Sequence, residues 1–137
     1  MLTTIEKLFL LQDVDLFSEA STDHLTLLAE LCEDHLVQAG RKVLQAGDTC
    51  PQLYLLVEGR VRLGAPDDPD GLKSEEVERS ALNFWNCLVG SPQTRNAVCT
   101  TDSRFLIIRS EDLLDVLTTE PGLSLAILRR HAAAHRS

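Results

Sequence analysis

The sequence is short of basic residues. Its 137 residues include 13 Lys and Arg against 21 Asp and Glu, which gives a formal net charge of -8 and a pI of about 4.9. Nucleic-acid affinity depends on clustered Lys and Arg side chains that displace counterions from the phosphate backbone. The charge balance therefore argues against a nucleic-acid-binding surface, and we expect no nucleic acid among the partners of this chain.

Long apolar runs are also missing. No stretch approaches the roughly 18 consecutive apolar residues from which a membrane-spanning helix is recognised. Residues 1–7 do not form a basic region followed by an apolar run, so no signal peptide is indicated. We therefore expect a soluble, cytoplasmic chain that does not insert into a membrane.

The cysteines lack the spacing of a metal or redox site. None of the four forms a CxxC pair, which excludes the usual zinc and dithiol motifs, and we expect reduced thiols that pack as small hydrophobic side chains: Cys32, Cys50, Cys87 and Cys99. No nucleophile with its base, and no set of metal ligands, can be assembled from the sequence. We therefore predict that the chain is not an enzyme and holds no metal.

The sequence does contain glycines set between short β-patterned runs, in residues 39–63. The chain must reverse direction at these glycines, where a Cβ would be costly: Gly40, Gly47 and Gly59. Between the last two, alternation puts three apolar side chains on one face of a strand: Leu53, Leu55 and Val57. This pattern predicts an antiparallel β-roll.

The length and a hydrophobic content of 44% suit one core, so we predict a single domain over residues 1–137. It divides into amino-terminal helices (1–34), a β-roll (35–109) and carboxy-terminal helices (110–137). Apolar spacing predicts helices over 4–11, from a cap at Ser21 or Thr22 to about Glu33, from a cap at Ser110 to a break at Pro121-Gly122, and over 123–136. Strands are predicted over 35–39, 42–45, 53–58, 60–63, 77–82, 95–100 and 104–109, with an exposed acidic loop in the first half of 64–78.

In this order the segments resemble the cyclic nucleotide-binding domain family. The family includes the catabolite activator and Fnr-type bacterial regulators, the regulatory subunits of cyclic-AMP-dependent kinase, and gated ion channels. The resemblance rests on Phe17-Ser18-Glu19-Ala20, on the Ala46-Gly47-Asp48 turn, on the strand and turn from Leu53 to Gly59, and on Arg104 to Ile108 before a Ser-Glu-Asp-Leu helix start. It implies a mainly β fold with flanking helices, a double-stranded β-helix (jelly-roll) of the cyclic-nucleotide-binding type.

The resemblance also implies a phosphate-binding cassette, and here the sequence departs from the family. The family cassette reads roughly Phe-Gly-Glu-Leu-Ala, then a few residues, then Pro-Arg-Ser/Ala-Ala-Thr-Val. With Pro92 on the family proline, Trp85 replaces the glycine, Asn86 the glutamate and Gln93 the arginine. A shift of one residue in the first part puts Asn86 on the glycine and Cys87 on the glutamate. Neither register restores the carboxylate, so the cassette is degenerate.

The candidate ligand-binding residues are those of the cassette: Trp85, Asn86, Cys87, Gln93, Thr94 and Arg95. Arg95 is the one cation that could replace the missing arginine, because in an extended segment it faces the same side as Gln93. Three hypotheses stay open. Arg95, with Thr94 and Asn86, holds an anionic nucleotide in a shifted pose; the cavity binds another ligand; or it binds nothing.

The resemblance thus predicts a non-catalytic regulatory or sensor module that binds a cyclic nucleotide weakly or not at all, with cyclic AMP and cyclic GMP as the candidate regulatory ligands. In the family, the ligand repositions the carboxy-terminal helices, which pass the signal to an effector. The alternative is a ligand-independent scaffold for protein interaction or dimerisation. For either role we expect a protein partner or a homodimer formed through the last helix, where residues 122–128 offer a modest apolar stripe.

Overall fold

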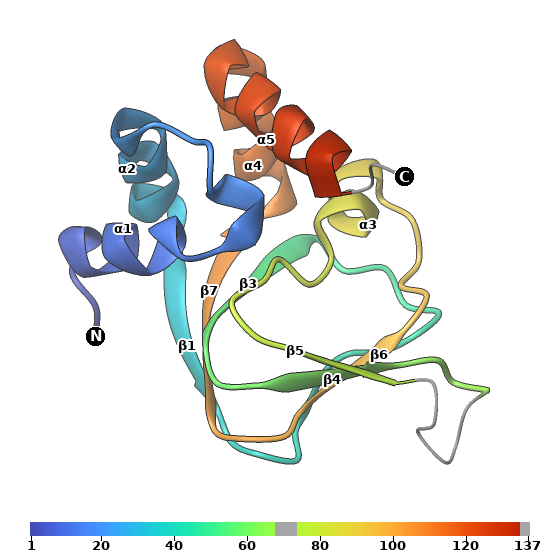
Figure 1. Cartoon of the computed structure of the whole chain (residues 1–137). Coiled ribbons are helices and arrows are strands. Elements are labelled where there is room, and N and C mark those ends of the chain that lie inside the picture. The colour runs from blue at the N-terminus through green and yellow to red at the C-terminus, as the bar shows by residue number, and fades with distance from the viewer. Residues whose placement is uncertain (68–73, 135–137) are drawn as a thin grey trace.

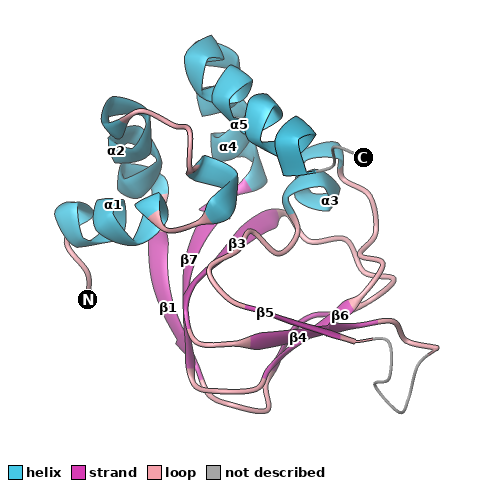
Figure 2. Ribbon diagram, viewed as in Figure 1, coloured by secondary structure: helices cyan, strands magenta, loops and turns pink. Residues whose placement is uncertain are grey.

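The structure is a computed structural model that describes residues 1–67 and 74–134. Helices gather on one side of a β-roll built from two antiparallel sheets (Figure 1, Figure 2). Part of the predicted acidic loop (68–73) and the end of the predicted last helix (135–136) lie outside the described residues.

The predicted elements occur in the predicted order, and the structure adds two that were not predicted, the 3-10 turn η1 (Asp15–Phe17) and the helix α3 (Phe84–Val89) between the fifth and sixth strands. The helices are α1 (Thr4–Gln12), the 3-10 turn η1 (Asp15–Phe17), α2 (Thr22–Leu31), α3 (Phe84–Val89), α4 (Ser110–Thr119) and α5 (Pro121–Ala134). The strands are β1 (Glu33–Val37), β2 (Lys42–Leu44), β3 (Gln52–Glu58), β4 (Val61–Gly64), β5 (Glu75–Val77), β6 (Asn96–Cys99) and β7 (Ser103–Arg109).

The two sheets confirm the predicted β-roll. One has the order β1-β7-β3 and the other β2-β6-β4-β5, and every pair is antiparallel. Neighbours in space are distant in sequence: β7 lies between β1 and β3, and β6 lies between β2 and β4. Connections that pass from one sheet to the other in this way give the jelly-roll arrangement. The β5–β6 connection, which includes α3, lies against the helices (Figure 1).

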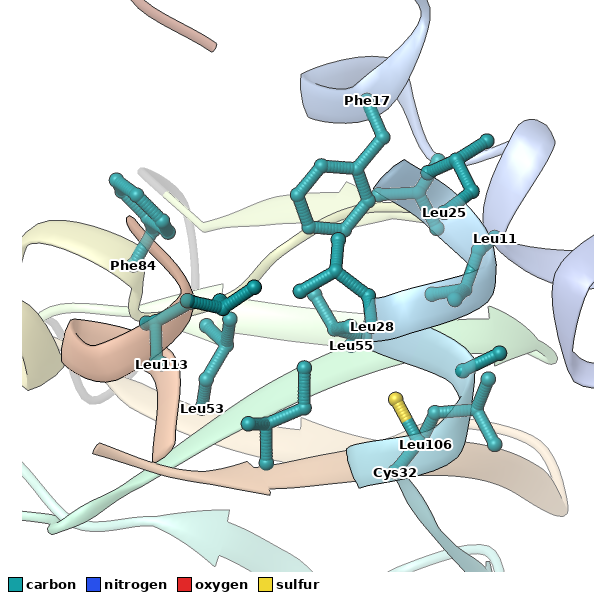
Figure 3. Close-up of a cluster of buried hydrophobic side chains, with 14 of the residues drawn as sticks. Leu11, Phe17, Leu25, Leu28, Cys32, Leu53, Leu55, Phe84, Leu106 and Leu113 are labelled. Atoms are coloured by element: carbon teal, nitrogen blue, oxygen red, sulfur yellow. The ribbon is translucent and has the colours of Figure 1, made fainter. Parts of the chain in front are cut away.

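Strand β3 is buried on both faces, and this divides the interior into two cores. As the alternation predicts, Leu53, Leu55 and Val57 face the helices. There they meet Phe17 and Leu28 in a cluster that we call the helix-side core (Figure 3). Leu56, between them, faces the inside of the roll with apolar side chains of the second sheet and of β7: Leu44, Val61, Leu63, Ala97, Cys99, Phe105 and Ile107.

The turn between β3 and β4 requires glycine. Gly59 has a φ of +96°, and a Cβ on it would lie 2.7 Å from the carbonyl oxygen of Asp102 and 2.8 Å from the Cα of Ser103. Only a residue without a side chain fits where this turn crosses the start of β7. The predicted reversal at Gly59 is therefore confirmed.

The strand predicted over 77–82 is wrong beyond Val77, its first residue. Strand β5 covers Glu75–Val77, and the chain then bends at Arg79, which has a φ of +49°. Residues 80–82 instead meet β3 of the other sheet: Leu56 N donates to Ser80 O (2.8 Å), and Leu82 N donates to Tyr54 O (3.0 Å). Alternation alone could not show that the chain changes sheets within this segment.

Two helix-boundary predictions also need correction. Arg109, not Ser110, is the N-cap of α4, and no side-chain cap bond forms there. Pro121 does not simply break the helix: α4 ends at Thr119, and Pro121 is the first residue of α5. Proline suits a first helical position, because its missing N–H would have no partner there in any case.

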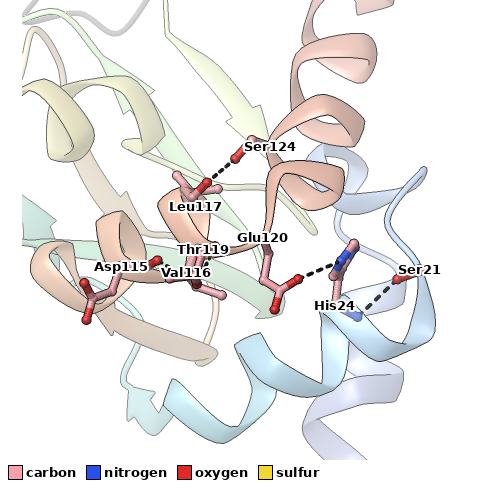
Figure 4. Close-up of polar contacts among 8 residues, drawn as sticks. All are labelled: Ser21, His24, Asp115, Val116, Leu117, Thr119, Glu120 and Ser124. Atoms are coloured by element: carbon pink, nitrogen blue, oxygen red, sulfur yellow. Dashed lines mark hydrogen bonds and ion pairs between the residues drawn. The ribbon is translucent and has the colours of Figure 1, made fainter.

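The joint between α4 and α5 is therefore a single residue, Glu120 (Figure 4). Its carboxylate lies 3.5 Å from Nε2 of His24 on α2, and a Cβ on Gly122 would lie 2.8 Å from Cε1 of the same ring. Across the joint, the Ser124 hydroxyl donates to Leu117 O (2.7 Å). These contacts place the start of α5 against α2 and the end of α4.

Candidate functional site

Helix α3 forms the first part of the cassette, and the buried side-chain amide of Asn83, the residue before it, anchors it to β3. The Asn83 side chain is 2% exposed; it accepts from Tyr54 N (3.0 Å) and donates to Gln52 O (2.9 Å). Phe84 and Cys87, three residues apart, point into the helix-side core. The helix ends at Gly90 in the left-handed conformation (φ +74°), a common helix C-terminus.

Asn86, which stands on the family glutamate in one register and on the family glycine in the other, forms hydrogen bonds within the cassette. Its amide nitrogen donates to the Ser91 hydroxyl (3.1 Å) and to Pro92 O (3.0 Å). These bonds tie α3 to the segment that follows it. An amide carries no negative charge, so Asn86 cannot offer a ribose hydroxyl the charge-assisted hydrogen bond that a carboxylate would accept.

Gln93, at the family arginine position, is 6% exposed and belongs to a different part of the roll. Its backbone N donates to Asp48 O and its carbonyl accepts from Gly47 N, both at 2.8 Å. The side chain lines a small cavity of about 190 Å³ beside β2 and the β2–β3 turn. Among the described residues, its Nε2 is buried without a hydrogen-bond partner.

The Arg95 side chain lies at the surface of the roll, not in its interior. Thr94 and Arg95 form a bend before β6 begins at Asn96, so the segment is not extended and Arg95 does not share a side with Gln93, contrary to the expectation from sequence. Nη1 of Arg95 lies 3.1 Å from Oε2 of Glu75 on β5, and the Arg95 side chain is 45% exposed. Thr94 is exposed as well.

The remaining two cassette candidates separate. Cys87 is 3% exposed in the helix-side core, where burial raises the pKa of its thiol to about 11, so it stays a neutral packing group. Trp85 is 39% exposed, and its ring meets His131 of α5 edge-on, with 4.9 Å between ring centroids. Trp85, one of the two candidates for the family glycine position, therefore contacts the last helix.

A cavity of about 380 Å³ lies between α3, η1 and α5. It brings together three of the six predicted site residues, Trp85, Asn86 and Arg95; Cys87, Gln93 and Thr94 do not line it. The other lining residues were not predicted and come from η1, from the segment before α3 and from α5: Asp15, Leu16, Ser80, Ala81, Leu82, Asn83, Phe84, Arg130 and His131. No sequence signal could have shown that residues 15 and 130 border the cassette, because only the folding back of α5 places them there.

An ion pair between α5 and η1 borders this cavity. Arg130 Nε lies 3.1 Å from each carboxylate oxygen of Asp15, and Nη2 lies 2.7 Å from Oδ1. These hydrogen bonds and the charge of Asp15 raise the pKa of Arg130. The carboxy-terminal turn of α5 is thereby held against the cassette by Asp15 on one side and Trp85 on the other.

Other features of the described residues do not add a site of this kind. A larger open groove of about 500 Å³, lined in part by Leu36, Glu58 and Arg104, contains no cassette residue. In residues 1–67 and 74–134, no three His, Cys, Asp or Glu side chains meet as metal ligands. Within the same part of the chain, no helix combines the length and the apolar character that crossing a membrane requires.

Comparison with known proteins gives a consistent result. The sequence model of the cyclic nucleotide-binding domain family matches residues 35–120 of this chain. A cyclic nucleotide-gated potassium channel of Rhizobium etli is 25% identical over 117 residues, which are 83% of this chain and 31% of the channel. The chain thus spans about a third of this curated relative.

Solved structures share the fold. A cyclic nucleotide-binding domain from Methylobacillus flagellatus matches 95% of this chain and 74% of its own, with a TM-score of 0.73 and 19% identity. The N-terminal domain of a transcriptional regulator from Streptomyces coelicolor matches 93% of this chain and 92% of its own, with a TM-score of 0.72 and 23% identity.

Proposed function

Because this chain belongs to the cyclic nucleotide-binding domain family, we propose that it is a non-catalytic regulatory module that binds cyclic AMP or cyclic GMP weakly or not at all. The observation that carries the proposal is the state of two cassette side chains. Asn86 donates its amide to Ser91 and Pro92, and Gln93 is buried beside the β2–β3 turn. Neither position supplies the charge that the family uses.

The size of the effect follows from the two missing charges. Loss of a hydrogen bond to a charged group costs about 1.5–3 kcal/mol, so two such losses reduce affinity by roughly 10²- to 10⁴-fold. Arg95 does not take the place of the family arginine, because it lines the 380 Å³ cavity whereas Gln93, at the family arginine position, lines a different one. The regulatory role is supported by α5, whose last turn contacts the cassette through Trp85.

The test is a melting-temperature titration with cyclic AMP and cyclic GMP. A ligand that binds only the folded state raises the melting temperature by mass action. We expect no rise for the natural sequence up to about 1 mM nucleotide. A clear rise for the natural sequence at micromolar nucleotide would contradict the proposal.

The second candidate is a ligand-independent scaffold for a protein partner or a homodimer. It is supported by exposed leucines on the carboxy-terminal helices: Leu114 at 46%, Leu125 at 46% and Leu128 at 52%. Two of them, Leu114 and Leu128, border an apolar groove of about 240 Å³ with Trp85 and Leu88. If α5 mediates dimerisation, Leu128→Ser should shift the mass measured by light scattering from dimer to monomer. Leu36→Ser, at an exposed leucine on β1, should leave it unchanged.

A further inference from the structure

Two arginines from distant parts of the chain line the 380 Å³ cavity. Arg95 precedes β6, Arg130 lies on the last turns of α5, and each is already held by a carboxylate, Glu75 and Asp15 respectively. Both carboxylates are 62% exposed. Exposed ion pairs contribute little, with a median of about 0–1 kcal/mol, so an anion that enters the cavity can compete for Arg95 at small cost. The Arg130–Asp15 pair is bidentate, so displacing Asp15 from Arg130 costs more.

The cavity contains further groups that suit a small organic anion. Ser80 lines it, and among the described residues its hydroxyl oxygen is buried without a hydrogen-bond partner. Trp85 offers an indole ring that is 39% exposed, on which a planar group can stack. The volume of about 380 Å³ lies within the range of small-molecule sites.

The number of arginines decides which anion fits. A cyclic nucleotide contains a phosphodiester with one negative charge, which a single arginine matches. A phosphate monoester carries about -1.5 to -2 at pH 7, and it presents three oxygens to the planar forks of guanidinium groups. Two guanidiniums therefore favour the monoester over the cyclic diester.

We propose that this cavity binds an acyclic nucleoside monophosphate, with the phosphate between Arg95 and Arg130 and the base against Trp85. This inference rests on the proposed function, because it assigns to the same cassette a ligand that differs from the cyclic nucleotides of the family. The bound phosphate competes with Asp15 for Arg130. Binding therefore weakens the contact between α5 and η1, and so connects the occupancy of the cavity to the position of the last helix.

The competition gives two substitutions with opposite effects. Arg130→Ala removes one of the two arginines that bind the phosphate, and it should lower the affinity for the nucleoside monophosphate about tenfold or more. Arg95→Ala should have the same effect. Asp15→Ala removes the internal competitor and should raise affinity severalfold. A purely structural Arg130–Asp15 pair predicts instead that both substitutions change affinity in the same direction. Arg60→Ala is the matched control, because Arg60 is exposed, faces Glu76 at 3.8 Å and does not line the cavity.

The experiment is isothermal titration calorimetry of the full chain with AMP, GMP, cyclic AMP, cyclic GMP and inorganic phosphate, with circular dichroism to confirm that each variant is folded. We expect AMP or GMP to bind at least tenfold more tightly than its cyclic form and than inorganic phosphate. Equal affinity for the cyclic and acyclic forms, equal affinity for phosphate alone, or loss of binding in Asp15→Ala overturns the inference. Tight cyclic AMP binding contradicts the proposed function itself, whereas weak binding of every nucleotide contradicts only this inference.

Discussion

The β3–β4 turn and the cassette both occupy positions where the family uses glycine, and this chain treats them differently. At the turn, Gly59 is present, and a Cβ would overlap the backbone of Asp102 and Ser103. In the cassette, one of the two registers puts Trp85 at the glycine position, and the Trp85 ring packs edge-on against Phe84 and His131. The first position is constrained by the backbone of a neighbouring strand, whereas at the second a large side chain is accommodated between other side chains.

The difference separates what preserves the fold from what preserves binding. Backbone contacts at Gly59 cannot adjust to a side chain without moving the start of β7, so a change there affects the whole roll. The cassette side chains contact one another and the last helix, and side chains of other types can make contacts there that stabilise the fold equally well. A chain can therefore keep this fold while its binding chemistry changes.

The largest effect is expected at the turn. Gly59→Ala adds a side chain at a φ of +96° and overlaps the Asp102 and Ser103 backbone, so it should lower the free energy of unfolding by about 3 kcal/mol or more. Gly40→Ala is the matched control: its φ is +90°, but nothing lies within 4 Å of the added Cβ. The control should lose only about 1 kcal/mol, from backbone strain alone. Urea denaturation measures both, and equal losses would show that the close approach to β7 is unimportant.

A smaller loss is expected at the base of the cassette. Asn83→Ala leaves the buried N–H of Tyr54 without its acceptor and should cost about 2–3 kcal/mol. Asn86→Ala removes two bonds near the surface and should cost less than about 1 kcal/mol. Denaturation curves in urea compare the two variants. A loss at Asn86 as large as that at Asn83 would mean that the outer cassette is part of the structural framework.

The smallest effect, visible only in alkali, compares two cysteines of the helix-side core, of which Cys87 lies on the cassette helix α3 and Cys32 at the end of α2. Burial raises the pKa of Cys32 to about 12 and that of Cys87 to about 11, from an ordinary 9.0. The unfolded thiols therefore ionise first, so the stability that depends on the neutral thiols is complete below pH 9 and is lost as the pH rises toward 11 and 12. Melting temperatures between pH 8 and pH 10.5 should fall less steeply in Cys32→Ala, and to a smaller degree in Cys87→Ala. Cys50→Ala, at the one cysteine that is not fully buried, is the control, and the same slope in all variants would refute the assignment.

Much of the fold could be predicted because its signals are local. Leu25, Leu28 and Ala29 follow helical spacing and are all buried in the helix-side core, and the Ser21 hydroxyl accepts from His24 N as an N-cap. The helix boundary at Ser110 and the strand over 77–82 were wrong for a shared reason. Each depends on where the chain leaves one sheet, and a contact with a distant segment decides that point.

The site could be predicted only in part. The replacement of the charged cassette residues is visible in the sequence, and so is Arg95. The partner of Arg95 and the opposite orientation of Gln93 depend on the bend at residues 94–95 and on β5. Asp15 and Arg130 lie 115 positions apart, and each resembles an ordinary surface charge until the fold brings them together.

The one-residue joint at Glu120 makes α5 a lever. The helix has 14 residues and is therefore about 21 Å long, and its near end is held by His24 while its far end reaches the cassette. A rotation of about 10° at Glu120 would carry the far end by about 4 Å, more than the length of a hydrogen bond. A small torsional change at this single peptide unit would thus be enough to make or break contacts at the opposite end of the helix.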